Sequence, residues 1–281
     1  MLVYPLSFKE FLSFKNISIQ TPYELLSKQD IIEKYFDEYI EYGGFPKVVL
    51  TDDEELKNSE LKNYFDSILL RDIVARYKLD NFQALERLAI FLLSSVSNQI
   101  SINKIKNHLG VSFDMANRYF EYLQNTFVID TLPLFDWSYK KQISNPKKIY
   151  SIDTGLSKRV SFEVGKKLGD MLENIVFLEL KREHEELYYF KTAQNYEVDF
   201  LVKERERITH LVQVSYSIKD EKTYKRELRA LVKAKEELQT SYEIALLLIT
   251  ADKSQDIVFE DINIKVINIY EWLLLKNMEI K

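Results

Sequence analysis

Hydrophobic residues recur at helical spacing through the first part of the chain. The first stripe consists of Ile31, Ile32, Tyr35, Phe36, Tyr39 and Ile40. The predicted helix ends at Gly43-Gly44, because glycine tolerates the left-handed conformation of a helix C-terminus. A second stripe follows at Leu61, Tyr64, Phe65, Ile68, Leu69 and Ile73. Residues 1–80 are therefore predicted to form a helical segment with packed apolar faces.

A different order of elements is predicted for residues 81–160. A helix over 84–97 precedes a short helix that Ser101 begins and that ends near Leu109. Gly110 makes the turn, and Ser112 begins a third helix that ends near Asn125. Strands at 128–134 and 148–152 follow, with a polar loop between them. This order is typical of a winged helix.

Residues 161–281 alternate between helix and strand patterns. Helices are predicted at 170–183 and 222–239, and a short terminal helix carries Trp272. Strands are predicted at 187–191, 198–203, 210–215, 244–250 and 264–268. The order predicts a small α/β domain, and the whole chain is expected to be an α+β protein.

Composition excludes several classes of function. The chain has no cysteine, which excludes a disulfide scaffold, a cysteine nucleophile and cysteine-ligated zinc. No phosphate-binding loop of the GxxxxGK[ST] type is present, so we expect no ATP site in this chain. No apolar run of about 18 residues and no signal-peptide pattern occur, which predicts a cytoplasmic protein without membrane contact.

Polar residues within the predicted α/β domain are candidates for chemistry. Asp199 lies in an otherwise apolar strand, where a carboxylate requires a partner, a metal ion or a strand-end position. Glu173 lies on the preceding helix and Gln213 on the next strand. Glu197 and Asp199, two residues apart, point to the same side of the strand, and oxygen ligands at this spacing suit Mg²⁺ or Mn²⁺. The alternatives are a surface carboxylate at Glu173, an ion-paired Asp199 and a hydrogen-bonded Gln213.

Two groups of cations are candidates for DNA contact in a chain whose net charge is −5. The wing loop contains Lys140, Lys141, Lys147 and Lys148. The helix over 222–239 has one cationic stripe, formed by Lys222, Arg226, Arg229 and Lys233. Such stripes bind phosphates in a salt-dependent way, although an ordinary solvated face has the same pattern.

The order of Glu173, Asp199 and Gln213 resembles the PD-(D/E)XK nuclease superfamily. The resemblance implies that a helix glutamate, a strand aspartate and a following (Asp/Glu)-x-Lys motif hold a divalent metal. Glu173 and Asp199 match the first two positions, but the third motif reads Gln213-Val214-Ser215. Serine does not replace the cationic lysine, and Lys191 is the candidate that would supply an ammonium from the preceding strand.

The chain as a whole resembles the C-terminal part of a family of archaeal and bacterial AAA+-type ATP-binding proteins. The strings that carry the resemblance include VYPLSFKEFL (3–12), YIEYGGFPKVV (39–49), KKIYSIDTGL (147–156), GDMLENIVFLEL (169–180) and YYFKTAQNYEVDFLV (188–202). The ATPase module that the family places before these strings is missing, so the chain is expected to be a truncated, split or separately encoded portion. Residues 1–80 would then bind a separate ATPase or a second copy of the chain.

These patterns lead to three expectations about function. The first is a DNA-associated protein with a degenerate, non-catalytic nuclease-like domain and no required cofactor. The second is an active Mg²⁺- or Mn²⁺-dependent DNA nuclease, in which Glu173, Asp199 and Gln213 hold the metal and Lys191 orients water. The third is a protein-interaction module that works with a separate ATPase. A truncated product without retained function is also compatible with the sequence.

Overall fold

The computed structural model describes residues 3–79, 81–161 and 168–275, and more of them are helical than extended. They form two compact units. Unit 1 comprises Met1–Ser18, Glu33–Thr131 and Pro146–Asn174, and unit 2 comprises Ile19–Ile32, Leu132–Asn145 and Ile175–Lys281. The mixture of helices and sheets confirms the α+β class. The segments 1–80, 81–160 and 161–281 do not coincide with these units, and that division stays a prediction.

Unit 1 consists mainly of helices. Its elements are α1 (Phe8–Phe14), α4 (Pro46–Val49), α5 (Glu54–Ser67), the π-helix η1 (Ile68–Val74), α6 (Ala75–Tyr77), α7 (Phe82–Ser94), β1 (Gln99–Ile100), α8 (Ile102–Leu109), α9 (Phe113–Asn125), β2 (Ile129–Leu132), β3 (Lys147–Ser151) and α11 (Thr154–Val160). The helices α3 (Gln29–Tyr42) and α12 (Leu168–Glu183) contribute residues to both units. No helix in the described ranges is long and apolar enough to cross a bilayer.

Local sequence signals set the ends of several helices in unit 1. The Ser101 side chain accepts a hydrogen bond from the Lys104 N–H at 3.2 Å at the start of α8. Gly110 ends that helix with a φ of 66°, and Ser112 then caps α9. Gly43, with a φ of 74°, follows α3. These boundaries confirm the predicted starts and stops.

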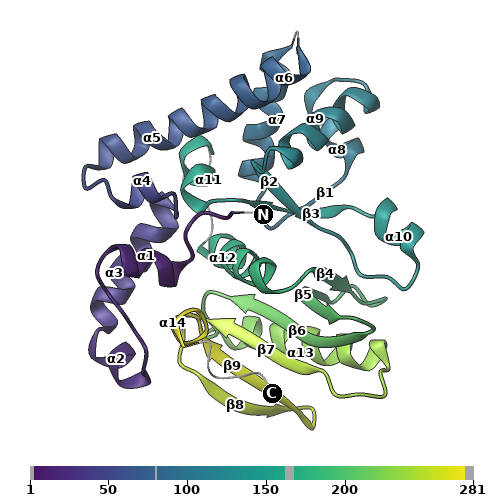
Figure 1. The fold of residues 1–281 in the computed structure, drawn as a ribbon. Coiled ribbons are helices and arrows are strands. Elements are labelled where there is room, and N and C mark those ends of the chain that lie inside the picture. The colour runs from purple at the N-terminus through teal and green to yellow at the C-terminus, as the bar shows by residue number, and fades with distance from the viewer. Residues whose placement is uncertain (1–2, 80, 162–167, 276–281) are drawn as a thin grey trace. The chain divides into compact units, whose positions relative to one another are not determined.

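The helices α5, η1 and α6 form one continuous rod (Figure 1). The buried residues Leu61, Phe65, Leu69 and Ile73 recur at every fourth position and are at most 3% exposed. An α-helix has 3.6 residues per turn, so a strict four-residue repeat drifts around its surface. The wider π-helical turns of η1 bring Leu69 and Ile73 back to the same apolar face.

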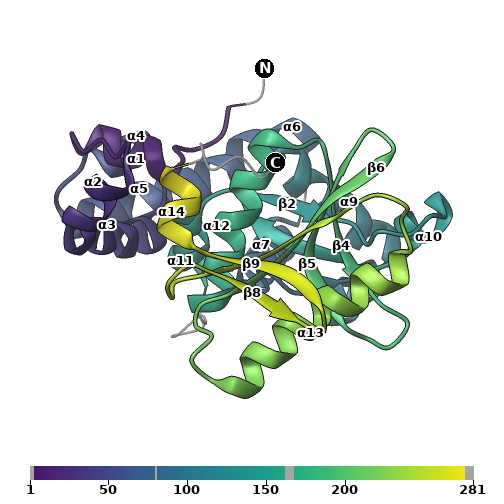
Figure 2. The ribbon, with the colours of Figure 1, turned by 90° about the horizontal axis from the view of Figure 1, so that it is seen from below.

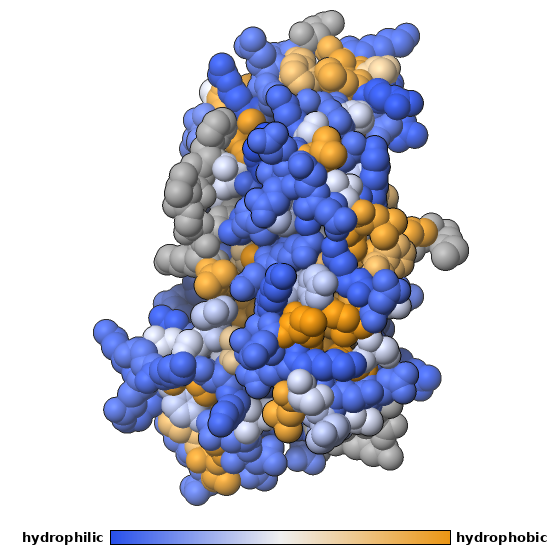
Figure 3. Space-filling model, turned by 90° about the vertical axis from the view of Figure 1, so that its left-hand side faces the viewer, coloured by the Kyte–Doolittle hydropathy of each residue, from blue (hydrophilic) through white to orange (hydrophobic). Residues whose placement is uncertain are grey.

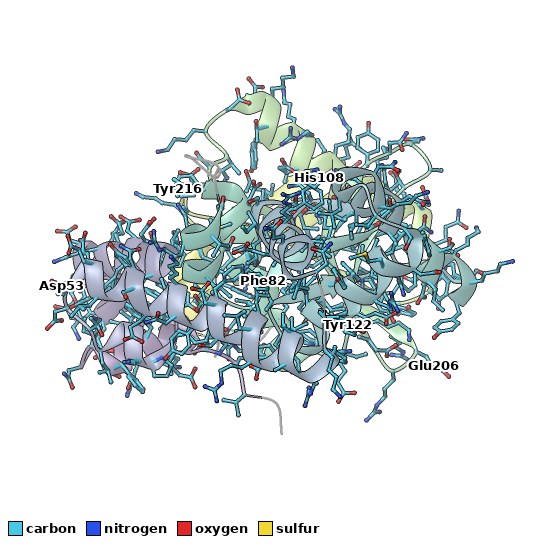
Figure 4. All side chains as sticks on the ribbon, turned by 90° about the horizontal axis from the view of Figure 1, so that it is seen from above. Asp53, Phe82, His108, Tyr122, Glu206 and Tyr216 are labelled. Atoms are coloured by element: carbon cyan, nitrogen blue, oxygen red, sulfur yellow. The ribbon has the colours of Figure 1, made fainter. Side chains whose placement is uncertain are left out.

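The region expected to be a winged helix contains the helices α7, α8 and α9 and a three-stranded sheet with the order β1-β3-β2, together with α10 (Tyr139–Ser144) and α11. Tyr122 of α9, labelled in Figure 4, stacks on Tyr77 of α6 with ring centroids 3.8 Å apart. The chain between β2 and β3 is not the polar loop that the sequence predicts. It contains the helix α10, which belongs to unit 2. Its apolar residues, Tyr139 and Ile143, lie at helical spacing.

Unit 2 is built around a six-stranded sheet with the order β4-β5-β6-β7-β9-β8 (Figure 1). Its strands are β4 (Glu186–Lys191), β5 (Glu197–Glu204), β6 (Arg207–Ser215), β7 (Ala245–Thr250), β8 (Gln255–Phe259) and β9 (Ile262–Asn268). Its helices are α2 (Pro22–Ser27), α13 (Glu221–Leu238) and α14 (Ile269–Leu274), in addition to α10 and its part of α12. The sequence predicted all of these strands except β8.

The sheet of unit 2 is antiparallel from β4 to β6 and parallel from β6 through β7 to β9. The helix α13 connects β6 to β7 and packs its leucines, including Leu228 and Leu231, on one face of the sheet. Phe177 of α12 stacks on Phe200 of β5, with ring centroids 6.4 Å apart, on the opposite side from α13 (Figure 2). The sheet is therefore covered on both faces near β5 and β6.

A buried carboxylate joins the tandem-glycine turn to α11 within unit 1. Asp153 Oδ2 accepts a hydrogen bond from the Gly44 N–H at 2.7 Å, and Oδ1 accepts one from the Leu156 N–H at 3.0 Å. A Cβ atom on Gly43 would lie 2.0 Å from Asp153 Oδ1, so no larger residue fits there without movement. Burial raises the pKa of Asp153 to about 6, while its backbone hydrogen bonds oppose that shift.

The variant Asp153→Ala should lower the free energy of unfolding by about 2–4 kcal/mol, because it removes a helix cap and leaves buried N–H groups unpaired. The raised pKa means that folded protein binds the Asp153 proton more tightly than unfolded protein does. The carboxyl therefore adds stability as the pH falls. In urea titrations, the loss caused by the variant should be larger by roughly 1 kcal/mol at about pH 5 than at about pH 7.

The matched control is Asp53→Ala. Asp53 Oδ1 caps α5 by accepting the Leu56 N–H at 2.9 Å, but it lies on the surface. That variant should cost about 1 kcal/mol. An equal or smaller loss for Asp153→Ala would contradict the role assigned to the buried carboxylate.

Candidate functional site

Asp199 and Gln213 lie on the neighbouring strands β5 and β6 and are hydrogen-bonded to each other. The Asp199 N–H donates to Gln213 Oε1 at 3.2 Å, and the Val214 N–H donates to Asp199 Oδ2 at 3.0 Å. Asp199 and Gln213 are each 7% exposed. The structure thus brings together two of the residues that the sequence singled out.

Glu227 of α13 completes this network and was not a candidate in the sequence. Gln213 Nε2 donates to Glu227 Oε2 at 2.7 Å, and Arg226 Nε donates to Glu227 Oε1 at 3.1 Å. Glu227 is 6% exposed, and desolvation raises its pKa although Arg226 opposes the shift. One signal was present: Glu227 lies four residues before Leu231, on the apolar face of the helix.

The side chains of Gln213, Arg226 and Glu227 form an internal hydrogen-bonded ion pair. Gln213 and Arg226 hold the two oxygens of Glu227, and the Gln213 carbonyl is held by the Asp199 N–H. The guanidinium of Arg226 supplies positive charge beside the buried Glu227 carboxylate. Within the described ranges, no group of three or more histidine, aspartate or glutamate residues could hold a metal.

Two other residues from the predicted nuclease motif lie apart from this network. Ser215 Oγ donates to the carbonyl oxygen of Ser217 at 3.1 Å. Lys191 is exposed at the end of β4, where it is paired in register with Glu197 of β5. Among the described residues, no hydrogen bond or ion pair joins Ser215 or Lys191 to Asp199 or Gln213. Neither residue therefore takes the place of the lysine in the third motif.

Glu173 has partners within unit 1. Its Oε1 atom accepts hydrogen bonds from the Tyr150 hydroxyl at 2.7 Å and from Lys148 Nζ at 3.1 Å. Lys148 was expected on the wing loop, facing DNA, but it lies in β3 and its side chain is only 2% exposed. This burial corrects that expectation. Asp199 belongs to unit 2, and a metal site shared with Glu173 stays a prediction.

The cationic stripe of α13 is present, and acidic residues pair with most of it. Arg226 pairs with Glu227, and Lys233 Nζ lies 2.8 Å from Glu236 Oε2. Arg229 Nε and Lys233 Nζ also lie 3.8 and 3.9 Å from the carboxylate oxygens of Glu260. The local field of this face is therefore weaker than a count of its cations suggests.

The remaining predicted DNA contacts lie on α10, at the start of β3 and at the start of α13. Lys140 and Lys141 are exposed on α10, and Lys141 Nζ lies 3.5 Å from Asp136 Oδ2. Lys147, the first residue of β3, is half-buried. Lys222 is exposed at the start of α13. Their contact with DNA stays a prediction.

Comparison with known proteins identifies two family matches. Residues 33–165 match the domain of unknown function DUF8612, and residues 168–272 match the domain of unknown function DUF4143. An uncharacterised protein of Methanocaldococcus jannaschii is 39% identical over 246 residues, which is 84% of this chain and 54% of that protein. An uncharacterised protein of Haemophilus influenzae is 33% identical over 221 residues, 77% of this chain and 52% of that protein. The chain thus spans about half the length of these relatives.

The variant Glu173→Gln tests the structural role of Glu173. It leaves the buried Lys148 ammonium without its carboxylate, so we expect the free energy of unfolding to fall by about 2–4 kcal/mol. The double variant Lys148→Met, Glu173→Leu should recover part of that loss, because it removes both charges. Glu60→Gln breaks the exposed pair of Glu60 with Lys47 and should have a much smaller effect in the same urea titration.

The variant Glu227→Ala tests the network of unit 2. It leaves the buried Gln213 amide without an acceptor, and we expect a loss of about 2–3 kcal/mol. Glu227→Gln retains an oxygen and should cost less. The control Glu236→Ala, on the exposed face of the same helix, should hardly change the midpoint of thermal unfolding. Equal effects at Glu227 and Glu236 would show that the network does not stabilise the fold.

Proposed function

We propose that this chain is a DNA-associated protein whose nuclease-like unit does not cut DNA. The observation that carries the proposal is the pairing of Glu227 with Arg226 and Gln213 next to Asp199. A nuclease of the PD-(D/E)XK type needs carboxylates that are open to a metal ion and a lysine that orients water. Here an arginine and an amide hold the acidic group, and Ser215 stands where the motif has lysine.

The order of elements in unit 2 supports the nuclease-like part of the proposal. The antiparallel strands β4, β5 and β6 are followed by α13 and by the parallel strand β7. Asp199 and Gln213 lie on the second and third of these strands, as the resemblance implies. The fold can persist without catalysis, because function depends on the site and not on the fold.

The helices α8 and α9 support DNA contact in unit 1. Gly110 makes a tight left-handed turn between them, and Ser112 caps the second helix, as in a helix-turn-helix motif. Lys104 and Lys106 are exposed on α8, and no ion pair with a described residue engages them. Arg118 is exposed on α9. Unpaired cations on such a motif favour contact with phosphates.

A second candidate function is a protein-interaction module that works with a separate ATPase. It is favoured by the length of the relatives, which are about twice as long as the stretch matched here. Leu50 and Leu56 of unit 1 are 65% and 59% exposed, which suits a partner surface. Figure 3 shows hydrophobic patches among hydrophilic residues on one face of the molecule. Under this candidate, the chain would have no affinity for DNA at moderate salt.

The experiment is a panel of fluorescent single-stranded, duplex, flapped and four-way DNAs with Mn²⁺. We expect shifted bands on native gels and no cleavage. The double variant Lys104→Ala, Lys106→Ala should weaken duplex binding and lower the slope of log affinity against log salt by about 2. The control is the double variant Lys9→Ala, Lys62→Ala, which removes two other exposed lysines of unit 1. It has the same net charge as the variant of Lys104 and Lys106.

Two outcomes would contradict the proposal. Mn²⁺-dependent cleavage that Asp199→Ala abolishes would establish an active nuclease. Neither cleavage nor a shift would favour the protein-interaction candidate, and size-exclusion chromatography with a purified AAA+ ATPase from the same genome would then test it.

A further inference from the structure

The segment of unit 2 around α10 exposes large hydrophobic side chains. Trp137, Tyr139 and Ile143 are 68%, 75% and 59% exposed. Neither the network of Asp199 nor the helices α8 and α9 involves them. Two aromatic rings and a branched side chain are exposed to water within seven residues. Exposing so much apolar surface is unfavourable, and such clusters mark binding surfaces.

The indole of Trp137 packs against a buried aromatic ring. Phe135, which is 4% exposed, contacts it edge to face with ring centroids 5.0 Å apart. Phe135 is itself packed against Tyr188 and Phe190, at 5.5 and 6.2 Å between centroids. A ring that is already oriented loses little conformational entropy when a ligand stacks on it.

Hydrogen bonds also fix the backbone that carries these rings. Asp136 Oδ1 accepts the Ser138 N–H at 2.8 Å, and the Asp136 carbonyl oxygen accepts a hydrogen bond from Gln142 Nε2 at 2.7 Å. The second of these links the start of the segment to α10. Trp137 and Tyr139 therefore lie on a structured platform.

Cations accompany the two rings. Lys140 and Lys141 follow Tyr139 directly, and the Lys141 side chain is 67% exposed. The stretch from Leu132 to Asn145 contains two lysines and one aspartate, while the whole chain has a net charge of −5. Positive charge next to exposed rings complements a ligand that combines phosphates with flat aromatic groups.

We propose that Trp137, Tyr139, Lys140 and Lys141 form a binding surface for single-stranded DNA. This inference rests on the proposed DNA association and specifies the form of DNA that this surface takes. Bases of a single strand can stack on the two rings while its phosphates contact the lysines. The bases of a duplex are stacked on one another and present only their edges.

The test is fluorescence anisotropy with a labelled thymidine oligonucleotide of about 16 nucleotides. Trp137→Ala should weaken binding about 5- to 100-fold, and Trp137→Phe should retain most of the affinity. The double variant Lys140→Ala, Lys141→Ala should lower the salt slope by about 1.4, which corresponds to two phosphate contacts. The control is Tyr23→Ala, which removes another aromatic side chain of unit 2 with 79% exposure.

The outcomes separate this inference from the proposed function. Single-strand affinity that Trp137→Ala leaves unchanged would overturn the surface assigned here, while duplex binding that depends on Lys104 and Lys106 would leave the proposed function standing. A wild-type protein that binds no DNA would overturn both. Anionic vesicles or a poly-glutamate peptide that bind with the same dependence on Trp137 would overturn the assignment to nucleic acid. If the variants have the same midpoint of thermal unfolding as the wild-type protein, a loss of binding is not caused by a loss of folding.

Discussion

Both units contain buried carboxylates, and each of these needs hydrogen-bond donors or cations from the protein in place of water. An ionised carboxylate is costly to bury, and the cost is offset only where N–H groups or cations surround it. Asp153 has backbone N–H partners, Glu173 has Lys148 and a tyrosine hydroxyl, and Glu227 has Arg226 and an amide. Each arrangement joins two different elements of the fold, and Asp153 joins segments that are more than 100 residues apart.

The same constraint bears on the function that we propose for unit 2. A carboxylate whose oxygens accept hydrogen bonds from protein donors is stable when no ion is bound, whereas a metal-binding carboxylate must remain open to its ligand. The environment of Glu227 meets the first requirement, because an arginine takes the position of the positive charge. The neutral amide of Gln213 donates a hydrogen bond to Glu227, whereas burial and, to a smaller extent, the nearby Asp199 carboxylate raise the pKa of Glu227.

Features that depend on neighbouring residues were predictable from the sequence. The caps Ser101 and Ser112 and the glycines at helix ends act within a few residues, and the structure confirms them. The strand β8 was missed because its sequence, QDIVF, lies at the edge of the sheet and is largely exposed, without a clear apolar alternation. The proximity of Asp199 to Gln213 followed from strand order. The contact with Glu227 could not be predicted, since it depends on the position of α13 over the sheet.

The charge of a surface also depends on residues that are distant in sequence. The stripe on α13 was identified by its helical spacing, but Glu260, in the turn between β8 and β9, lies beside two of its cations. A residue that is distant in sequence thus changes the field of a face that looked basic. The phosphate backbone attracts cations that are free of such partners, and single-stranded bases need exposed rings besides. Lys104 and Lys106 of α8 have no ion-pair partner among the described residues. The surface near α10 combines exposed rings with Lys140 and Lys141, although Lys141 also pairs with Asp136. The DNA contacts proposed above therefore lie on α8 and near α10.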